Sequence, residues 1–171
     1  MPYNIENITI CSACEKELPI VADLARRIWP ETYEAILDEG QIAYMLKMMY
    51  DAPVLAKEYA EGIRFDLIFD GGKPIGFASY GPYRNDPPEA KLHKLYLDFA
   101  YHGRGIGALT LNHVTEEARR KGYRFLRLNV NKNNAAAIRA YERNGFRKLE
   151  AVEVDIGHGF VMDDFVMRKE L

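Results

Sequence analysis

The segment that most constrains the fold of this chain runs from Lys91 to Gly107, KLHKLYLDFAYHGRGIG. It begins with a strand pattern and ends in a turn whose glycines, Gly103, Gly105 and Gly107, lead directly into a helical pattern. Glycine lets the backbone turn tightly and lets a ligand approach without meeting a Cβ atom. Because the first N–H groups of a helix lack backbone acceptors and carry the positive end of the helix dipole, this turn predicts a pyrophosphate site. A turn that only connects the strand to the helix is the alternative.

The hydrophobic patterns on either side of this turn predict a mixed α/β chain. The expected strands are Tyr3–Ile10, Phe65–Phe69, Ile75–Tyr80, Ala90–Asp98, Phe125–Val130, Phe146–Val154 and Phe160–Met167. The expected helices run from Glu17 to about Pro30, from an Asp38 cap to the break at Pro53, over Gly105–Lys121 and from Asn134 to Arg143, with a further helical turn or two over Val54–Tyr59. Three antiparallel strands followed by a β-α-β crossover require a mixed sheet.

Length and composition limit the class of protein. The 171 residues contain no repeat or linker, so residues 1–171 are expected to form a single domain. The formal net charge of −2 gives no reason to expect nucleic acid or an anionic membrane as a partner. No apolar run reaches the roughly 20 residues that cross a bilayer. The N-terminal MPYNIENITI also lacks the pattern of a signal peptide, so a cytoplasmic location is expected.

The two cysteines, Cys11 and Cys14, form a C-x-x-C between a strand pattern and a helix pattern. That context is compatible with a thioredoxin-like redox pair. A zinc site would need a second pair of Cys or His ligands at suitable spacing, which the sequence lacks, so no metal is expected. Two incidental reduced thiols in a loop are the simpler interpretation.

The glycine turn also fits a different cofactor class. Gly103, Gly105 and Ala108 satisfy G-x-G-x-x-A, which is typical of a Rossmann dinucleotide site. That site would follow the first strand, and an acidic residue would close the next one. Here the turn lies past the midpoint of the chain and the next strand ends Asn129-Val130-Asn131. A Rossmann-type NAD(P) oxidoreductase is therefore the weaker alternative.

Two blocks of the sequence resemble the signatures of GNAT N-acetyltransferases. The string HGRGIG at His102–Gly107 is similar to Q/R-x-x-G-x-G/A, with His102 in place of Gln or Arg. The string NAAAIRAYERNGF at Asn134–Phe146 is similar to N-x-x-A-x-x-x-Y-E-x-x-G-F. The resemblance covers the C-terminal half of the chain. It implies a central mixed, mostly antiparallel sheet of about seven strands flanked by about four helices, and acetyl-CoA as cosubstrate without a metal.

The resemblance also implies which residues bind acetyl-CoA. The pantetheine arm and thioester would lie along the backbone of Leu95, Tyr96 and Leu97 as an added strand, and Asn134 would bind the same arm. The pyrophosphate would be held by His102, Gly103, Arg104, Gly105, Ile106, Gly107 and Ala108. Because this turn works mainly through backbone N–H groups, His102 is expected to be a tolerated replacement.

Two side chains are candidates for proton transfer. Tyr141 aligns with the general acid of the family, and a phenol with a pKa of about 10 can protonate a departing thiolate at neutral pH. The structural alternative is a tyrosine packed on the sheet. His93 shares a strand face with Leu95 and Leu97 and is the candidate base. PaiA-type relatives carry a carboxylate at this position. An ordinary polar residue of an alternating strand is an equal alternative.

The acceptor is expected to be a primary amine of a small molecule or a peptide, attacking directly in a ternary complex. The strand LHKLYL and the ending IGHGFVMDDFVMRKEL resemble the PaiA-type polyamine acetyltransferases, so a polyamine is favoured. Between Glu150 and Asp164 there are five acidic residues and no Lys or Arg, and such a patch would attract a cationic acceptor. A solvated acidic hairpin is the alternative. A non-catalytic acyl-CoA sensor stays open, as does a homodimer.

Overall fold

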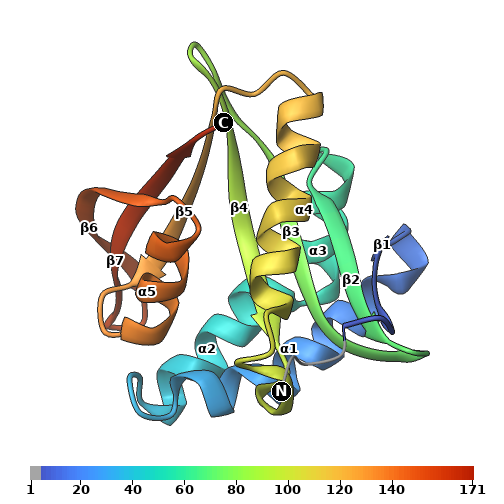
Figure 1. Ribbon diagram of the computed structural model, residues 1–171. Helices are drawn as coiled ribbons and strands as arrows, with labels where there is room; N and C mark the ends of the chain where they lie inside the picture. Colours follow the sequence, from blue (N-terminus) through green and yellow to red (C-terminus); the bar gives the residue numbers. More distant parts are fainter. Residues whose placement is uncertain (1–4) are drawn as a thin grey trace. The chain divides into compact units, whose positions relative to one another are not determined.

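The computed structural model of the protein describes residues 5–171, which contain seven β-strands and five α-helices (Figure 1). The strands are β1 (Ile8–Ser12), β2 (Arg64–Asp70), β3 (Lys73–Asn85), β4 (Pro88–Leu97), β5 (Phe125–Asn131), β6 (Arg147–Gly157) and β7 (Phe160–Glu170). The helices are α1 (Leu18–Tyr33), α2 (Glu39–Tyr50), α3 (Ala52–Ala60), α4 (Ile106–Arg120) and α5 (Ala135–Arg143). Two short 3-10 turns, η1 (Glu15–Glu17) and η2 (Phe99–Tyr101), precede α1 and α4.

The order of elements expected from the sequence is confirmed, and the differences lie at the boundaries. The strand expected over Tyr3–Ile10 is β1, which begins at Ile8; residues 3 and 4 lie outside the described residues. Helix α1 continues through Pro30 to Tyr33 instead of ending near Pro30. A proline lacks an N–H and its ring crowds the carbonyl four residues earlier. The helix nevertheless continues, since the Glu34 N–H donates to the Pro30 carbonyl at 2.9 Å.

The count of five helices exceeds the expected four because the turn expected over Val54–Tyr59 is the complete helix α3. Pro53 lies in its first turn, where a missing N–H removes no helical hydrogen bond. The cap expected at Asp38 is confirmed, since its carboxylate accepts a hydrogen bond from the Gln41 N–H at 2.8 Å.

The strands form a sheet in the order β1-β2-β3-β4-β5-β7-β6. Strands β4 and β5 are parallel, as the crossover through α4 requires. The pairs β1–β2, β2–β3, β5–β7 and β6–β7 are antiparallel. The expected mixed, mostly antiparallel sheet is therefore confirmed.

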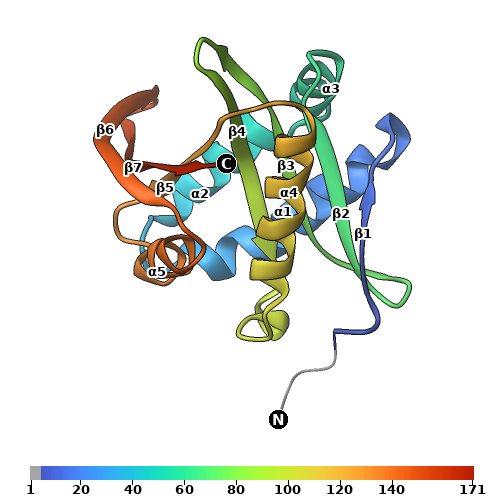
Figure 2. The ribbon, with the colours of Figure 1, turned by 45° about the horizontal axis from the view of Figure 1, so that its top comes forward.

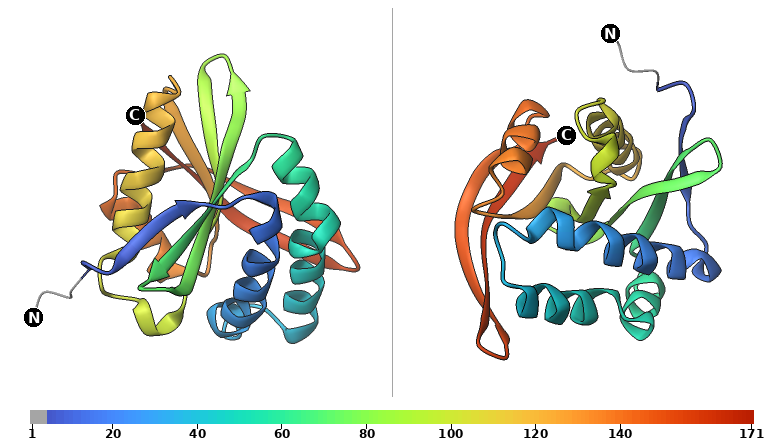
Figure 3. Two further views of the ribbon diagram at one scale, coloured as in Figure 1. Left: turned by 90° about the vertical axis from the view of Figure 1, so that its right-hand side faces the viewer. Right: turned by 90° about the horizontal axis from the view of Figure 1, so that it is seen from below.

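The chain divides into two compact units, and strands β3 and β4 contribute to both. The first unit extends to Gly81 and also includes Lys94–Thr110. Its helices α1, α2 and α3 pack on one another (Figure 3). The aromatic residues Trp29, Tyr33, Tyr50, Phe77 and Tyr96 form a cluster with ring centroids 4.7–6.3 Å apart. A second cluster joins the buried Ile68 and Ile75 to Ile106 at the start of α4.

The second unit comprises Pro82–His93 and Leu111–Leu171. The long β6–β7 hairpin and α5 form its C-terminal part (Figure 2). Strand β5 pairs with β7 over its whole length, and its alternate residues Leu126, Leu128 and Val130 are buried. This alternation is the period-2 pattern from which the strand was predicted.

Candidate active site

The end of β4 presents backbone groups that no neighbouring strand uses in the pairing. The parallel pairing of β4 with β5 runs from Glu89 to Leu92, while β4 continues to Leu97. The Asp98 N–H donates to the Ile75 carbonyl of β3 at 2.8 Å, so the peptide groups of Leu95 and Leu97 point away from β3. The Leu97 carbonyl lies 2.8 Å from Nε2 of His102. Apart from the Leu97 carbonyl, which His102 contacts, the backbone groups of Leu95 and Leu97 form the kind of edge that an extended ligand needs.

The backbone of β3 approaches the backbone of this strand end unusually closely. A Cβ atom built on Gly76 would lie 2.5 Å from the Tyr96 carbonyl oxygen and 3.2 Å from the Leu97 Cα. Only glycine allows the two backbones to approach this closely. The position of Tyr96 and Leu97 is therefore set by a residue that the sequence analysis did not single out.

The side chains at the strand end face two directions. Leu95 and Leu97 pack in the cluster that contains Ile106, so they fix the start of α4 against the sheet. Tyr96 points the other way, where its hydroxyl lies 2.8 Å from that of Tyr33 and its ring contacts Trp29. Tyr96 therefore turns its carbonyl toward β3 and packs its side chain in the core, and the edge itself is formed by Leu95 and Leu97.

The turn before α4 has the geometry expected of an anion cradle. Gly103 and Gly105 have φ values of 74° and 82°, in the left-handed region that favours glycine, and a Cβ at either position would meet nothing within 4 Å. The Leu109 N–H donates to the Gly105 carbonyl at 3.0 Å. The N–H groups of the three residues before Leu109 therefore precede the helical ladder and point out of the helix end. These are the donors a pyrophosphate needs.

Side chains around the turn brace it. His102 reaches back to Leu97 and contacts the ring of Phe99 at 5.1 Å. The Arg104 guanidinium lies 5.0 Å from the ring centre of Tyr101. The Tyr101 hydroxyl donates to Asp70 at 2.9 Å, and this hydrogen bond raises the pKa of Tyr101. His102 thus connects the turn to β4, a role that the comparison with the family signature did not anticipate.

The other candidates belong to the second unit. Asn134 caps α5, because its side-chain oxygen accepts a hydrogen bond from the Ala137 N–H at 3.3 Å, and its Nδ2 group is the donor left for a ligand. The ring of Tyr141 is half-buried and packs against Phe146, with centroids 5.8 Å apart. His93 is exposed near the end of β4. The candidate residues from Leu95 to Ala108 thus lie together in the first unit. His93, Asn134 and Tyr141 belong to the second unit.

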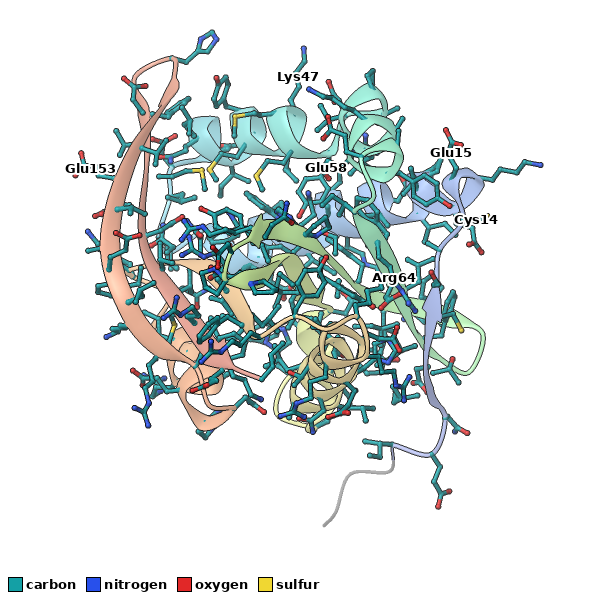
Figure 4. The ribbon with its side chains drawn as sticks, turned by 90° about the horizontal axis from the view of Figure 1, so that it is seen from above. Cys14, Glu15, Lys47, Glu58, Arg64 and Glu153 are labelled. Atoms are coloured by element: carbon teal, nitrogen blue, oxygen red, sulfur yellow. The ribbon has the colours of Figure 1, made fainter. Side chains whose placement is uncertain are left out.

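Several charged residues are buried where strand alternation alone did not mark them. Lys94 of β4 is 3% exposed and pairs at 2.9 Å with Glu58, which Figure 4 labels on α3. Arg127 of β5 pairs with the fully buried Glu89 at 2.7 Å. Asp164 of β7 is 5% exposed. The sequence signal for such burial is a charged residue at a strand position that faces inward. Its ion-pair partner could not be found from the sequence, because the partner lies tens of residues away.

Three further expectations concern metals, cysteines and membranes. Within residues 5–171, no group of three or more His, Cys, Asp or Glu side chains could hold a metal ion. Cys11 and Cys14 are both exposed free thiols. Over the same residues, no helix combines the length and apolar character that a membrane span needs.

Comparison with known proteins assigns the chain to a family. The model of the acetyltransferase (GNAT) family matches residues 22–146. The chain belongs to the GNAT acetyltransferase family. A spermidine N(1)-acetyltransferase of Thermoplasma acidophilum is 28% identical over 153 residues, which cover 86% of this chain and 91% of that protein. An uncharacterized N-acetyltransferase of Methanocaldococcus jannaschii is 35% identical over 86 residues, which cover 48% of this chain but only 38% of that protein.

A solved structure gives the same assignment. The crystal structure of the PaiA N-acetyltransferase from Thermoplasma acidophilum in complex with coenzyme A superposes with a TM-score of 0.81. The two chains are 27% identical, and the match covers 96% of this chain and 99% of that one. The predictions of a GNAT fold, an acyltransferase and acetyl-CoA as cosubstrate are confirmed by this membership. The Rossmann alternative is wrong, because the glycine turn follows the fourth strand of a mostly antiparallel sheet.

Proposed function

We propose that this GNAT protein transfers the acetyl group of acetyl-CoA to a primary amine, with a polyamine as the favoured acceptor. Residues 1–171 act as a single catalytic domain, and the amine attacks directly in a ternary complex. The cytoplasmic location and the homodimer stay predictions.

The observation that carries this proposal is the turn between β4 and α4. Its two left-handed glycines leave open space beside the free N–H groups of the helix start. Such a cradle fits a diphosphate, whose charge the helix dipole favours. The free edge at Leu95–Leu97 precedes the turn in the chain and fits the extended amide chain of pantetheine.

Each candidate residue has a role in the proposed binding. Leu95, Tyr96 and Leu97 hold the pantetheine arm through their backbone groups, and Asn134 donates its Nδ2–H to the same arm. The backbone from His102 to Ala108 holds the pyrophosphate. The bound cosubstrate supplies a thioester carbonyl, which an amine can attack without an enzyme-bound acetyl group.

Two residues of the chain then move protons. His93 accepts a proton from the acceptor ammonium, directly or through water, and so frees the nitrogen lone pair. The nitrogen bonds to the acetyl carbon while the carbon–sulfur bond breaks. Tyr141 gives its hydroxyl proton to the departing thiolate and regains a proton from the acetylated nitrogen. The products are an N-acetyl amine and free CoA.

A similarity to one relative supports the polyamine. The spermidine acetyltransferase of Thermoplasma acidophilum aligns over 91% of its own length, so nearly all of that protein has a counterpart in this chain. Amine substrates of this class are multiply charged cations at neutral pH, which a protein with buried carboxylates can recognise.

The proposal is tested by measuring CoA release with acetyl-CoA and a panel of polyamines, monoamines and lysine peptides. CoA is separated chromatographically, because the exposed Cys11 and Cys14 would react with a thiol dye. We expect Tyr141→Phe to lower turnover by about tenfold or more while acetyl-CoA affinity stays within about twofold. Tyr123→Phe, half-buried beyond α4, is the matched control.

The possible results separate the competing functions. Full turnover in Tyr141→Phe would remove this residue from the acid role. Tight acetyl-CoA binding without acetylation of any amine would favour the non-catalytic sensor instead.

A further inference from the structure

The second unit has a long strand with an open edge. Strand β6 is the last strand of the sheet, and among residues 5–171 only β7 pairs with it. Alternate residues of an antiparallel edge strand direct their N–H and C=O groups away from the sheet. The outer side of β6 therefore presents a row of backbone donors and acceptors. This strand has 11 residues, whereas β1, the other terminal strand of the order, has five.

The side chains of β6 leave this edge accessible. Every residue from Arg147 to Asp155 is exposed except the half-buried Val152, and the strand contains no proline. Leu149 and Val154 are apolar yet 47% and 49% exposed. A long, exposed strand edge with apolar side chains is a surface to which another strand can pair.

The middle of β6 is regular strand. Its pairing with β7 shifts register between Lys148 and Glu150 and again between Asp155 and Gly157. Between Glu150 and Asp155 the register is continuous. The two shifts bend the strand near its ends, so the regular stretch Glu150–Asp155 is the part best suited to pair with a further strand.

The acidic residues of the β6–β7 hairpin divide between its two faces. Residues paired across an antiparallel ladder share a face, and the register pairs Glu153 with Asp163. Glu153 and Asp155 therefore share one face with Asp163, while Asp164 lies on the other. The single acidic patch expected across the hairpin does not match this geometry. Glu153 points away from the hairpin into solvent (Figure 4).

The charges of β6 are separated along its length. Arg147 and Lys148 stand at its start, and Glu150, Glu153 and Asp155 follow. Within residues 5–171, none of these five side chains forms an ion pair. A second β6 running in the same direction would place like charges side by side. An antiparallel second β6 places the basic start of each strand opposite the acidic end of the other, so the strand is complementary to itself.

We propose that β6 pairs antiparallel with β6 of a second copy of this chain, about a two-fold axis at Ala151, and so forms a homodimer. Arg147 of each copy then lies beside the acidic end of the other strand, at the partner subunit's Asp155. An axis at Glu150 would instead place that carboxylate against the partner subunit's Glu150, and like charges opposite each other are unfavourable. Because both copies use the same edge, the contact closes at two copies. This inference does not depend on the proposed enzymatic function.

Sedimentation equilibrium over an about 100-fold range of protein concentration measures the assembly. We expect the wild-type chain of 19.6 kDa to approach twice that mass at high concentration. A contact confined to one pair of strands is small beside the usual interface of about 1,600 Å², so the dimer should dissociate on dilution. It should also weaken as salt is raised, because the facing charges are exposed.

Two charge-reversed variants test the pairing itself. Arg147→Glu with Lys148→Glu makes β6 acidic throughout, and Glu153→Lys with Asp155→Lys makes it mostly basic. Each variant alone should be a monomer, because like charges then face each other, whereas an equimolar mixture of the two should form a heterodimer.

The matched control changes the net charge by the same amount outside β6. Lys121→Glu with Arg139→Glu replaces two exposed basic residues of the same unit, and this variant should dimerise as the wild type does. A wild type that stays monomeric at every concentration would overturn the inference. Dimers that persist in both charge-reversed variants, or variants that fail to associate when mixed, would overturn it as well.

Amide hydrogen exchange gives a readout that needs no variant. As the protein concentration rises, the outward-facing amides within Glu150–Asp155 should exchange more slowly by about tenfold or more, because they gain hydrogen bonds to the second copy. The amides of β1, the other terminal strand, should be unaffected. Slower exchange in β1 instead of β6, or in neither strand, would overturn the inference even if a charge-reversed variant failed to fold.

Discussion

The replacement Gly76→Ala tests whether β3 sets the position of the strand edge proposed to bind the thioester. The new Cβ would lie 2.5 Å from the Tyr96 carbonyl oxygen, whereas ordinary contact begins at 3.4 Å. The two strands must therefore separate by about 0.9 Å, and the close atoms belong to backbone that cannot rotate away.

The separation has two measurable consequences. Overpacking of this kind costs about 1–3 kcal/mol, which lowers the melting temperature of a chain of this size by about 2–12 °C. A displacement of about 1 Å at a catalytic strand can also cost up to about 100-fold in activity. We therefore expect acetyl-CoA affinity and kcat/KM each to fall by at least about tenfold.

Calorimetry measures both quantities on one sample, by thermal unfolding and by titration with acetyl-CoA. Gly72→Ala is the matched control, because it lies in the same hairpin and its Cβ would meet nothing within 4 Å. If Gly76→Ala matched Gly72→Ala in melting temperature and acetyl-CoA affinity, the close approach of β3 to Tyr96 would be refuted. A lower melting temperature with unchanged affinity would refute only the assignment of the thioester to this strand.

Two further perturbations probe the turn and the hairpin. Gly105→Ala places a side chain at φ 82°, so we expect a loss of about 1–2 kcal/mol in unfolding free energy and weaker CoA binding by titration. Gly107→Ala, in the first turn of α4, should keep the unfolding free energy, because its Cβ would meet nothing within 4 Å; an equal loss of unfolding free energy in the two variants would contradict the strained-turn argument. Because burial raises the pKa of Asp164, the folded protein binds this proton more tightly than the unfolded chain does. The wild-type protein should therefore lose stability relative to Asp164→Asn as pH rises from about 3.9 through the higher folded pKa, and parallel stability profiles in denaturant at pH 4 to 7 would refute this.

The order of elements was predictable because local signals were strong. The Asp38 cap, the glycines of the turn before α4 and the alternation in β5 each report a property of a few consecutive residues. The boundary at Pro30 was not predictable, because packing of the buried Trp29 and Tyr33 stabilises the last turn of α1 beyond the proline.

The candidate site was predictable only in part, because some of its features are local in sequence and others depend on tertiary packing. The cofactor turn is one continuous segment, so its glycines and its helix start are visible in the sequence. The requirement for Gly76 and the pairing of Lys94 with Glu58 depend on which strands and helices become neighbours. Which acidic residues of the β6–β7 hairpin share a face depends on strand register, which a shift between Lys148 and Glu150 changes by one residue.

The central claim is that the backbone amides from Gly103 to Ala108 hold the diphosphate of CoA. Titration of the isotope-labelled protein with CoA, followed through amide ¹⁵N–¹H chemical shifts, tests it directly at 19.6 kDa. The expected result is saturable binding in which the amides of Gly103, Gly105 and Gly107 shift strongly, with smaller shifts when pantetheine without the diphosphate is added. Binding that leaves these amides unmoved, or no binding at all, would contradict the claim.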